Sequence, residues 1–408
     1  MRQLTNLFLA LFLLLALATI LLGLGDLALP LPGLLSFWPM LHRICLILGV
    51  VLYCSLAFNR HLPKRVLLPL LLWLFWDLLG YWPVPDLLGS SARLLIGLVQ
   101  LLLILALLRH IRRDNEVSPW LVPSQFTGPS FSARNLLIFI ALNIFIMPVA
   151  LLLLGYSAAD RFVTQATAGF VDLQPRGIYM SEKIYRRGDK EIRLAAMVHL
   201  ASQDYYTELV DSIPRSGTLI LAEGVTDKQG LLKNRFDYGN LAEFLGLSSQ
   251  SALQLPGRVI DPTEFAEPAP AVQSGPDIMR ADIDLSEFDP RTIEVLDTLA
   301  EKVLNAPSPV QGYFAFNRWA SENASANIDK IIMNDLLDKR NRALLSYLPQ
   351  ALKRYDTLLI PWGALHMKGL EQALLEQGFT LRKTLQRLSI DFQQLPYERI
   401  LHSLSSTE

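Results

Sequence analysis

Three residues in the second half of the chain have side chains that could do chemistry together: His199, Glu223 and His366. Each follows a short apolar segment, LAAMV before His199, TLILA before Glu223 and TLLIPWGAL before His366. Two imidazoles and a carboxylate suit a divalent metal ion, with Zn, Mn and Co as candidates, and leave a coordination position for water. Such an ion makes water more acidic and polarises a carbonyl group, which is the chemistry of a metal-dependent hydrolase.

The two histidines stand in matched surroundings. Ala196 precedes His199 by three residues, and Gly363 precedes His366 by three. An amphipathic helix is predicted to begin soon after each histidine, which places both at the carboxyl ends of strands, where open α/β sheets bind ligands. A single histidine in such a place is usually structural, but two in matched segments, which resemble a weak internal repeat, favour a shared role as ligands.

Glu223 ends a predicted buried strand, and Gly224 then interrupts the apolar pattern. A buried carboxylate is costly unless it is paired or bound to a cation. The sequence leaves three partners open, namely a metal ion, an arginine or the N-terminus of the next helix. If Glu223 is not a metal ligand, we expect it to act as the general base.

The predicted helix 327–348 has apolar residues at helical spacing and a densely charged middle, DKRNR. Asn334, Asp338, Asn341 and Arg342 fall on one of its faces. Either this face is solvated, or it aims a cation and an amide at the site. In the second case the face would orient an anionic group or stabilise an oxyanion.

Taken in order, five segments resemble the TraB/Tiki (TraB/GumN-like) family of membrane-associated metallohydrolases. They are AAMVHLAS, LILAEG, ADIDLSEFDP, DKRNRALLSYL and LIPWGALHMKGL, and they span most of the second half of the chain. The resemblance implies an α/β domain built from two related halves, with paired G-x-x-H motifs, a strand-end glutamate and an Arg-Asn helix. The animal Tiki branch is regarded as membrane-tethered, metal-dependent peptidases.

Carried over by position, the resemblance implies His199, His366 and Glu223 at a metal centre, with Arg340 and Asn341 in support. Arg340 would bind a substrate carboxylate or the developing oxyanion. The chain departs from the family pattern in having Ala in place of the first motif's Gly, and in the GVTD sequence that follows the glutamate. The second departure leaves the substrate open.

A soluble α/β domain with a largely parallel or mixed sheet is predicted over residues 157–395, because strands and helices alternate. Pro349 is expected to stop its last long helix, and residues 396–408 to form a polar tail with a solvated His402. The predicted elements are the hairpin 177–198, helix 203–213, strand 218–222, helix 239–247, a long loop over 254–288, helices 290–305 and 327–348, strand 357–362, helix 367–377 and strand 379–392.

The first half of the chain is far more apolar than the second. The whole chain is 51% hydrophobic and only 18% charged, and its mean hydropathy is +0.30. Residues 1–156 are predicted to be a membrane domain of about five transmembrane helices, since each apolar run is close to the roughly 20 residues that cross a bilayer. The runs are 4–24, 42–58, 66–82, 93–108 and 135–155. Asp77 lies near the end of the third run and is expected at the membrane interface.

The distribution of charge predicts the orientation. Residues 1–155 carry ten Lys and Arg against five Asp and Glu, a net +5, while the remainder is net −6. In a five-span arrangement eight basic residues fall on one side, and only Arg43 and Arg93 fall on the other. The positive-inside rule then predicts a cytoplasmic N-terminus and an extracytoplasmic C-terminal domain, periplasmic if the membrane is a bacterial inner membrane.

The second half contains no cysteine, which excludes a thiol nucleophile or an internal disulfide there. It also has no basic block, so nucleic acid is not an expected partner. The expected partners are the lipid bilayer and a peptide or protein substrate. The alternative function is a non-catalytic membrane receptor or signalling-shutdown protein that binds a peptide with the same fold, and it predicts that His366→Ala keeps biological activity.

Overall fold

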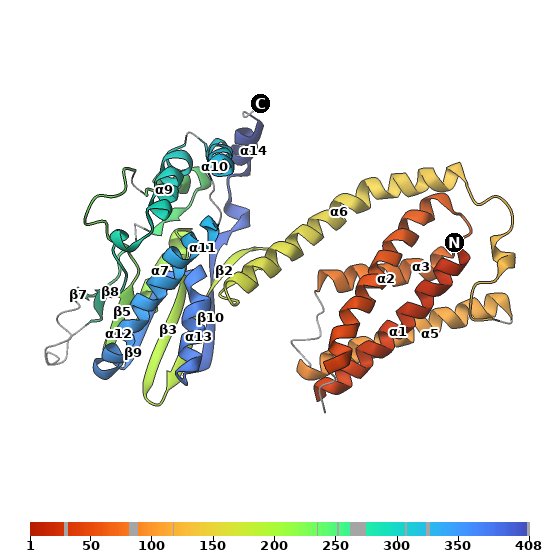
Figure 1. The fold of residues 1–408 in the computed structure, drawn as a ribbon, viewed down its shortest axis with the longest axis horizontal. Coiled ribbons are helices and arrows are strands. Elements are labelled where there is room, and N and C mark those ends of the chain that lie inside the picture. Colours follow the sequence, from red (N-terminus) through yellow and green to blue (C-terminus); the bar gives the residue numbers. More distant parts are fainter. Residues whose placement is uncertain are drawn as a thin grey trace. The chain divides into compact units, whose positions relative to one another are not determined.

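The computed structural model describes residues 1–27, 32–80, 89–116, 118–234, 236–250, 253–261, 275–306, 308–323 and 327–405. The chain divides into two compact units, Met1–Ala158 and Ala159–Glu408. The first unit is helical, and the second is an α/β domain (Figure 1).

The first unit consists of apolar helices. Its helices are α1 (Arg2–Leu27), α2 (Pro32–Phe58), α3 (Lys64–Leu79), α5 (Ala92–Asn115) and α6 (Ala133–Ala166), with 3-10 turns η1 (Gly89–Ser91) and η2 (Pro123–Phe126). The segment Ser36–Phe58 of α2, together with α1, α5 and α6, gives four helices long and apolar enough to cross a membrane. The chain therefore has the features of an integral membrane protein.

The sequence predicted five membrane-crossing runs, and α3 is the one that the structure leaves short. It has 16 residues, which corresponds to roughly 24 Å of helix against about 30 Å of hydrocarbon. Residues 81 and 82, the end of the predicted run, lie outside the described residues. Asp77, predicted at the interface, has a partner in α2, since its Oδ2 lies 2.9 Å from His42 Nε2.

The second unit is built on an eight-stranded mixed sheet in the order β1-β2-β3-β9-β5-β8-β7, with β10 also paired to β2. The pairs β3–β9, β9–β5, β5–β8 and β8–β7 are parallel, and the pairs that β2 makes are antiparallel. The strands are β1 (Val171–Gln174), β2 (Gly177–Arg187), β3 (Lys190–Met197), β5 (Thr218–Ala222), β7 (Arg258–Val259), β8 (Asp277–Arg280), β9 (Thr357–Gly363) and β10 (Thr380–Asp391). A short separate ladder pairs β4 (Leu200–Ala201) with β6 (Ser248–Ser249).

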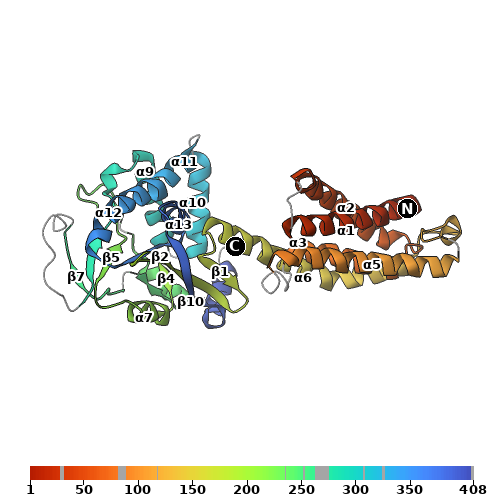
Figure 2. The same cartoon turned by 90° about the horizontal axis from the view of Figure 1, so that it is seen from below.

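Helices cover both faces of the sheet, with α7 on one face and α12 and α13 on the other (Figure 2). This explains the nearly continuous apolar sequence of the central strand β9, in which Leu358 to Trp362 are all buried. The α-helices of the unit are α7 (Gln203–Asp211), α8 (Gly239–Leu245), α9 (Pro290–Leu299), α10 (Pro309–Asn323), α11 (Ile328–Met333), α12 (Arg340–Arg354), α13 (Met367–Glu376) and α14 (Tyr397–Ser405). Two π-helical turns, η6 (Ala300–Leu304) and η7 (Asn334–Lys339), extend α9 and join α11 to α12.

The mixed, mostly parallel sheet confirms the predicted fold class at this level, and the hairpin of β2 and β3 and strand β5 lie where they were predicted. The predicted loop 254–288 was wrong in part, because β8 lies inside it as a strand of the main sheet. That strand has only four residues and owes its extended form to pairing with β5. Residues 262–274 of the predicted loop lie outside the described residues.

The sequence predicted that Pro349 stops the helix, and this was wrong: α12 continues to Arg354. A proline inside a helix costs one backbone hydrogen bond, but Leu348, Ala351 and Leu352 beside it are buried in the core of the unit and hold the helix in place. Helix α10 and strand β1 were not predicted. Part of the predicted polar tail forms helix α14, and residues 406–408 lie outside the described residues.

Candidate functional site

The three strands that precede the candidate residues are neighbours in the sheet. Strand β9 lies between β3 and β5, and both pairs are parallel, with Met197 opposite Gly363 and Ile220 opposite Leu359. The carboxyl ends of parallel strands meet at one edge of a sheet. His199, His366 and Glu223 therefore all follow strands that end at the same edge of the sheet, which is the arrangement that a shared site needs.

His366 is 3% exposed and lies in the turn η8 (Ala364–His366) between β9 and α13. Its Nδ1 is 2.8 Å from Asn341 Oδ1, and Asn341 Nδ2 donates to the His366 carbonyl at 3.3 Å. With the amide oxygen facing the ring, Nδ1 carries the proton and Nε2 presents a lone pair. Gly369 makes this approach possible, because a Cβ there would lie 2.7 Å from Asn341 Nδ2.

Burial and charge keep the His366 ring neutral. Burial and the nearby Arg340 guanidinium lower the pKa of His366 to about 4, although Glu223 and Asp282 oppose this shift. The ring also packs edge-on against Trp362, with 5.0 Å between the ring centroids. A neutral imidazole with a fixed ring plane is the form in which histidine binds metal ions.

Glu223 faces His366 across a short gap, with 3.6 Å between Oε1 and Nε2. Oε1 also accepts a hydrogen bond from Arg340 at 2.7 Å, and Oε2 accepts one from the backbone N–H of Gly363 at 2.7 Å. The Glu223 side chain is 11% exposed. Each carboxylate oxygen has two lone pairs, so Oε1 keeps acceptor capacity toward the gap.

Arg340 joins Glu223 to a second carboxylate, that of Asp282. The guanidinium donates from Nε at 3.0 Å and from a terminal nitrogen at 2.7 Å. The Asp282 side chain is completely buried and also accepts from the Gly224 N–H at 2.9 Å. Burial alone would lower the pKa of Arg340, but Asp282 and Glu223 raise it above its usual value. Arg340 therefore stays charged and fixes both carboxylates.

His199 lies apart from this cluster and is exposed. Its Nδ1 is 2.8 Å from Gln250 Oε1, and its ring stacks on Tyr238 with 4.7 Å between the centroids. Among the described residues, no group of three His, Cys, Asp or Glu side chains is close enough to hold a metal ion. The structure thus brings together four of the five predicted residues and leaves His199 on the rim.

The pair formed by His366 and Glu223 fits a cation. Two hydrogen-bond acceptors, the lone pair of Nε2 and the oxygen Oε1, face each other, and neither supplies a proton to the other. Two ligands about 2.1 Å from one tetrahedral zinc ion stand roughly 3.4 Å apart, which is close to the observed 3.6 Å. The donor set is therefore compatible with two ligands of a divalent metal.

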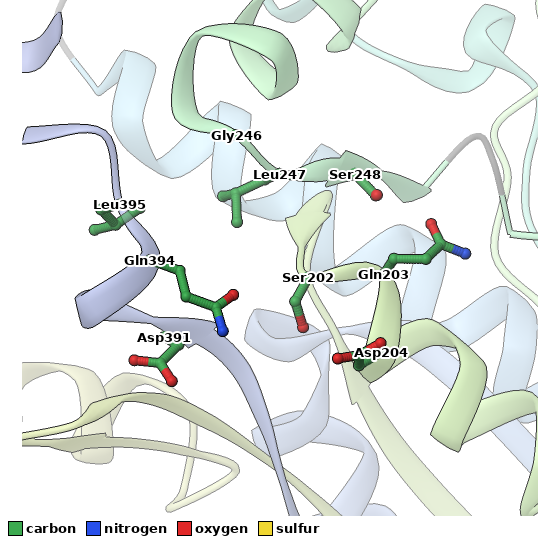
Figure 3. Close-up of a pocket in the computed structure, with 9 residues that line it drawn as sticks. All are labelled: Ser202, Gln203, Asp204, Gly246, Leu247, Ser248, Asp391, Gln394 and Leu395. Atoms are coloured by element: carbon green, nitrogen blue, oxygen red, sulfur yellow. The ribbon is translucent and has the colours of Figure 1, made fainter.

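A polar hollow of about 250 Å³ lies beside the β4–β6 ladder. Ser202 and Gln394 reach toward it from opposite walls (Figure 3). None of the predicted site residues lines the hollow, and it is smaller than the roughly 300–1,000 Å³ of a site for a whole ligand. It is therefore not part of the candidate centre.

Sequence reasoning missed Asp282, Tyr238 and Gln250. Asp282 lies between the buried residues Ala281 and Ile283 in the ADIDLSEFDP segment. A charged residue between two apolar ones was the sequence feature that could have indicated its role. Tyr238 and Gln250 precede and follow a short helix and had no signal, because only the fold brings them to His199. Of the partners that the sequence left open for Glu223, the structure shows an arginine, Arg340.

The chain matches no protein-family model, no curated protein and no solved structure. The resemblance to the TraB/Tiki family therefore rests on the sequence motifs alone and stays a prediction.

Proposed function

We propose that the C-terminal unit is a metal-dependent, peptidase-like hydrolase anchored in a membrane. The observation that carries this proposal is the pair of facing acceptors, Nε2 of the buried His366 and Oε1 of the largely buried Glu223, separated by 3.6 Å. His199 Nε2 would supply a third ligand from the rim of the same edge. A divalent ion bound there would polarise a carbonyl and acidify water.

The surrounding residues have separate roles in this proposal. Asn341 fixes the plane and tautomer of His366, in the way that outer hydrogen bonds orient metal-binding histidines. Glu223, Asp282 and the Leu336 carbonyl engage all three nitrogens of the Arg340 guanidinium, so its role is to hold Glu223 rather than to bind substrate. If Glu223 is not a ligand, its Oε1 is the acceptor that takes a proton from the attacking water.

The hydrolase would lie outside the cytoplasm if α3 crosses the membrane. Support comes from the antiparallel course of α3 against α2. The chain turns between Phe58 and Lys64, and Asp77 near the end of α3 contacts His42 in the first half of α2. A four-crossing arrangement would also divide the ten basic residues five and five, without the bias that membrane proteins show. A reporter fused after Ala166 tests this proposal: activity of a periplasmic reporter supports it, and activity of a cytoplasmic one contradicts it.

The alternative is a non-catalytic membrane receptor that binds a peptide. One observation favours it: His199 is exposed, and the described residues contain no complete three-ligand group. On this alternative the buried ion pairs of Glu223, Arg340 and Asp282 serve only to stabilise the fold.

Elemental analysis of the full chain purified in detergent tests the hydrolase proposal. We expect about one Zn, Mn or Co ion per chain and loss of that ion in His366→Ala. His402→Ala is the matched control, because His402 is an exposed histidine of the same unit outside the site. Absence of metal from the unmodified chain, or equal metal content in His366→Ala and the control, would overturn the proposal.

A further inference from the structure

A single short segment, residues 238–250, makes three contacts with His199, and we call it the clamp segment. At its start, the Tyr238 ring lies parallel to the His199 ring, with an interplanar angle of 13°. At its end, Gln250 binds the ring through Oε1 and the backbone of His199 through its N–H, at 2.8 Å in each case. The β4–β6 ladder lies between these contacts, with Leu200 opposite Ser249.

Hydrogen bonds within the clamp segment stabilise its backbone. The Tyr238 carbonyl accepts the first helical bond of α8 from Ala242 at 2.8 Å, and α8 ends at Gly246 in the left-handed conformation. Leu247 then donates back to Ala242 at 2.8 Å before β6 begins. The backbone at Tyr238 is therefore held by the first turn of α8.

The Tyr238 ring lies against His199, which follows a strand that ends at the same edge of the sheet as the strand before Glu223. Within the part of the chain that the structure describes, the phenol makes no hydrogen bond. The O–H group is thus available to a ligand at the edge where both His199 and Glu223 stand.

We propose that Tyr238 is a catalytic residue of this site, whose phenol O–H donates a hydrogen bond to the carbonyl oxygen of a substrate amide. This inference rests on the proposed hydrolase function. When water adds to the carbonyl carbon, the C=O π electrons move to that oxygen, and the phenol stabilises the negative charge while keeping its own proton. When the C–N bond breaks, the carbonyl re-forms and the amine leaves with a proton from the attacking water.

Tyr238→Phe and Tyr238→Ala separate the hydroxyl from the ring. Phe keeps the stack on His199 and removes only the donor, whereas Ala removes both. Loss of one oxyanion donor lowers kcat about 10²- to 10³-fold, so we expect Tyr238→Phe to lower kcat by that factor with KM nearly unchanged. The probe is a fluorogenic peptide mixture hydrolysed by the full chain in detergent.

Two binding measurements accompany the kinetics. By calorimetry, Tyr238→Phe should bind Zn²⁺ within about twofold of the unmodified chain, while Tyr238→Ala should bind it roughly 10-fold more weakly, because the support of His199 is lost. A phosphinic dipeptide, a tetrahedral anion, should bind Zn²⁺-loaded Tyr238→Phe about 10- to 100-fold more weakly, as expected for one hydrogen bond to a charged group. Tyr313→Phe on α10 is the control, since Tyr313 is 61% exposed.

The outcomes distinguish this inference from the proposed function. Unchanged kcat and unchanged phosphinic dipeptide affinity in Tyr238→Phe would overturn the donor role while leaving the metal centre standing. Equal loss of Zn²⁺ affinity in the Phe and Ala variants would show a structural role only and would also overturn it. If the unmodified chain binds no metal, the proposed function fails, and the donor role fails with it.

Discussion

His366 and His199 follow neighbouring strands, and both have Nδ1 bound by a side-chain amide oxygen at 2.8 Å. Their surroundings nevertheless differ. His366 follows the central strand β9 and is 3% exposed, in contact with Asn341 and Trp362. His199 follows β3 and is exposed, and the clamp segment contacts it.

The difference shows that one edge of the sheet carries a fixed half and an open half of the same candidate site. On the fixed half, Arg340 ties Glu223 to the completely buried Asp282 side chain, and these charges are costly to separate in a region of low dielectric. On the open half, aromatic stacking and neutral hydrogen bonds position His199. We expect substitutions on the fixed half to lower stability as well as metal binding, and those on the open half to change ligand binding with little effect on stability.

The largest effect should come from Arg340→Ala. Removing the guanidinium leaves two buried carboxylates without a counter-charge, which typically costs about 3–5 kcal/mol. The thermal unfolding midpoint of the full chain in detergent should fall by on the order of 10 °C. Arg342→Ala on the exposed face of the same helix is the control and should change stability by less than about 0.5 kcal/mol. Equal midpoints for the two variants would refute the division into halves.

A direct comparison of His366→Ala and His199→Ala, without added metal, should give an intermediate effect. His366→Ala leaves the buried Asn341 amide oxygen unpaired, for a loss of about 1–3 kcal/mol in the free energy of unfolding. His199→Ala removes an exposed ring and should change it by less than about 0.5 kcal/mol. Chelator-treated protein unfolded by urea provides the measurement. If the two losses are the same, burial does not distinguish the two histidines.

The smallest effect should come from Gly363→Ala, which makes the second histidine motif match the first. A Cβ at Gly363 would meet nothing closer than 3.6 Å, an ordinary van der Waals distance, so stability and metal content should stay within about 0.5 kcal/mol and twofold. Gly369→Ala provides the contrast, because its Cβ would lie 2.7 Å from Asn341 Nδ2 and must displace that side chain. A large loss of metal in Gly363→Ala would mean that the small residue itself has a role.

Much of the architecture was readable from local patterns. Long apolar runs predicted the four candidate membrane-spanning helices together with a fifth, α3, that is short, and the hairpin of β2 and β3 and strand β5 followed from alternation and turn residues. Strand β8 was not readable, since four residues carry too little periodicity and the strand exists through its pairing with β5. The predicted helix stop at Pro349 was wrong for a related reason. Burial of the neighbouring side chains in the core outweighs the backbone hydrogen bond that the proline cannot make.

The sequence by itself determined which chemistry was available: histidines and a glutamate after apolar strands, and an Arg-Asn helix. These assignments depend on residue type and spacing, which are local properties. Only the tertiary structure decided which groups meet. The order β3-β9-β5 buries His366 beside Glu223 and leaves His199 at the rim. Asp282 and Tyr238 belong to the site for the same reason: strand order and helix packing bring together residues that are distant along the chain.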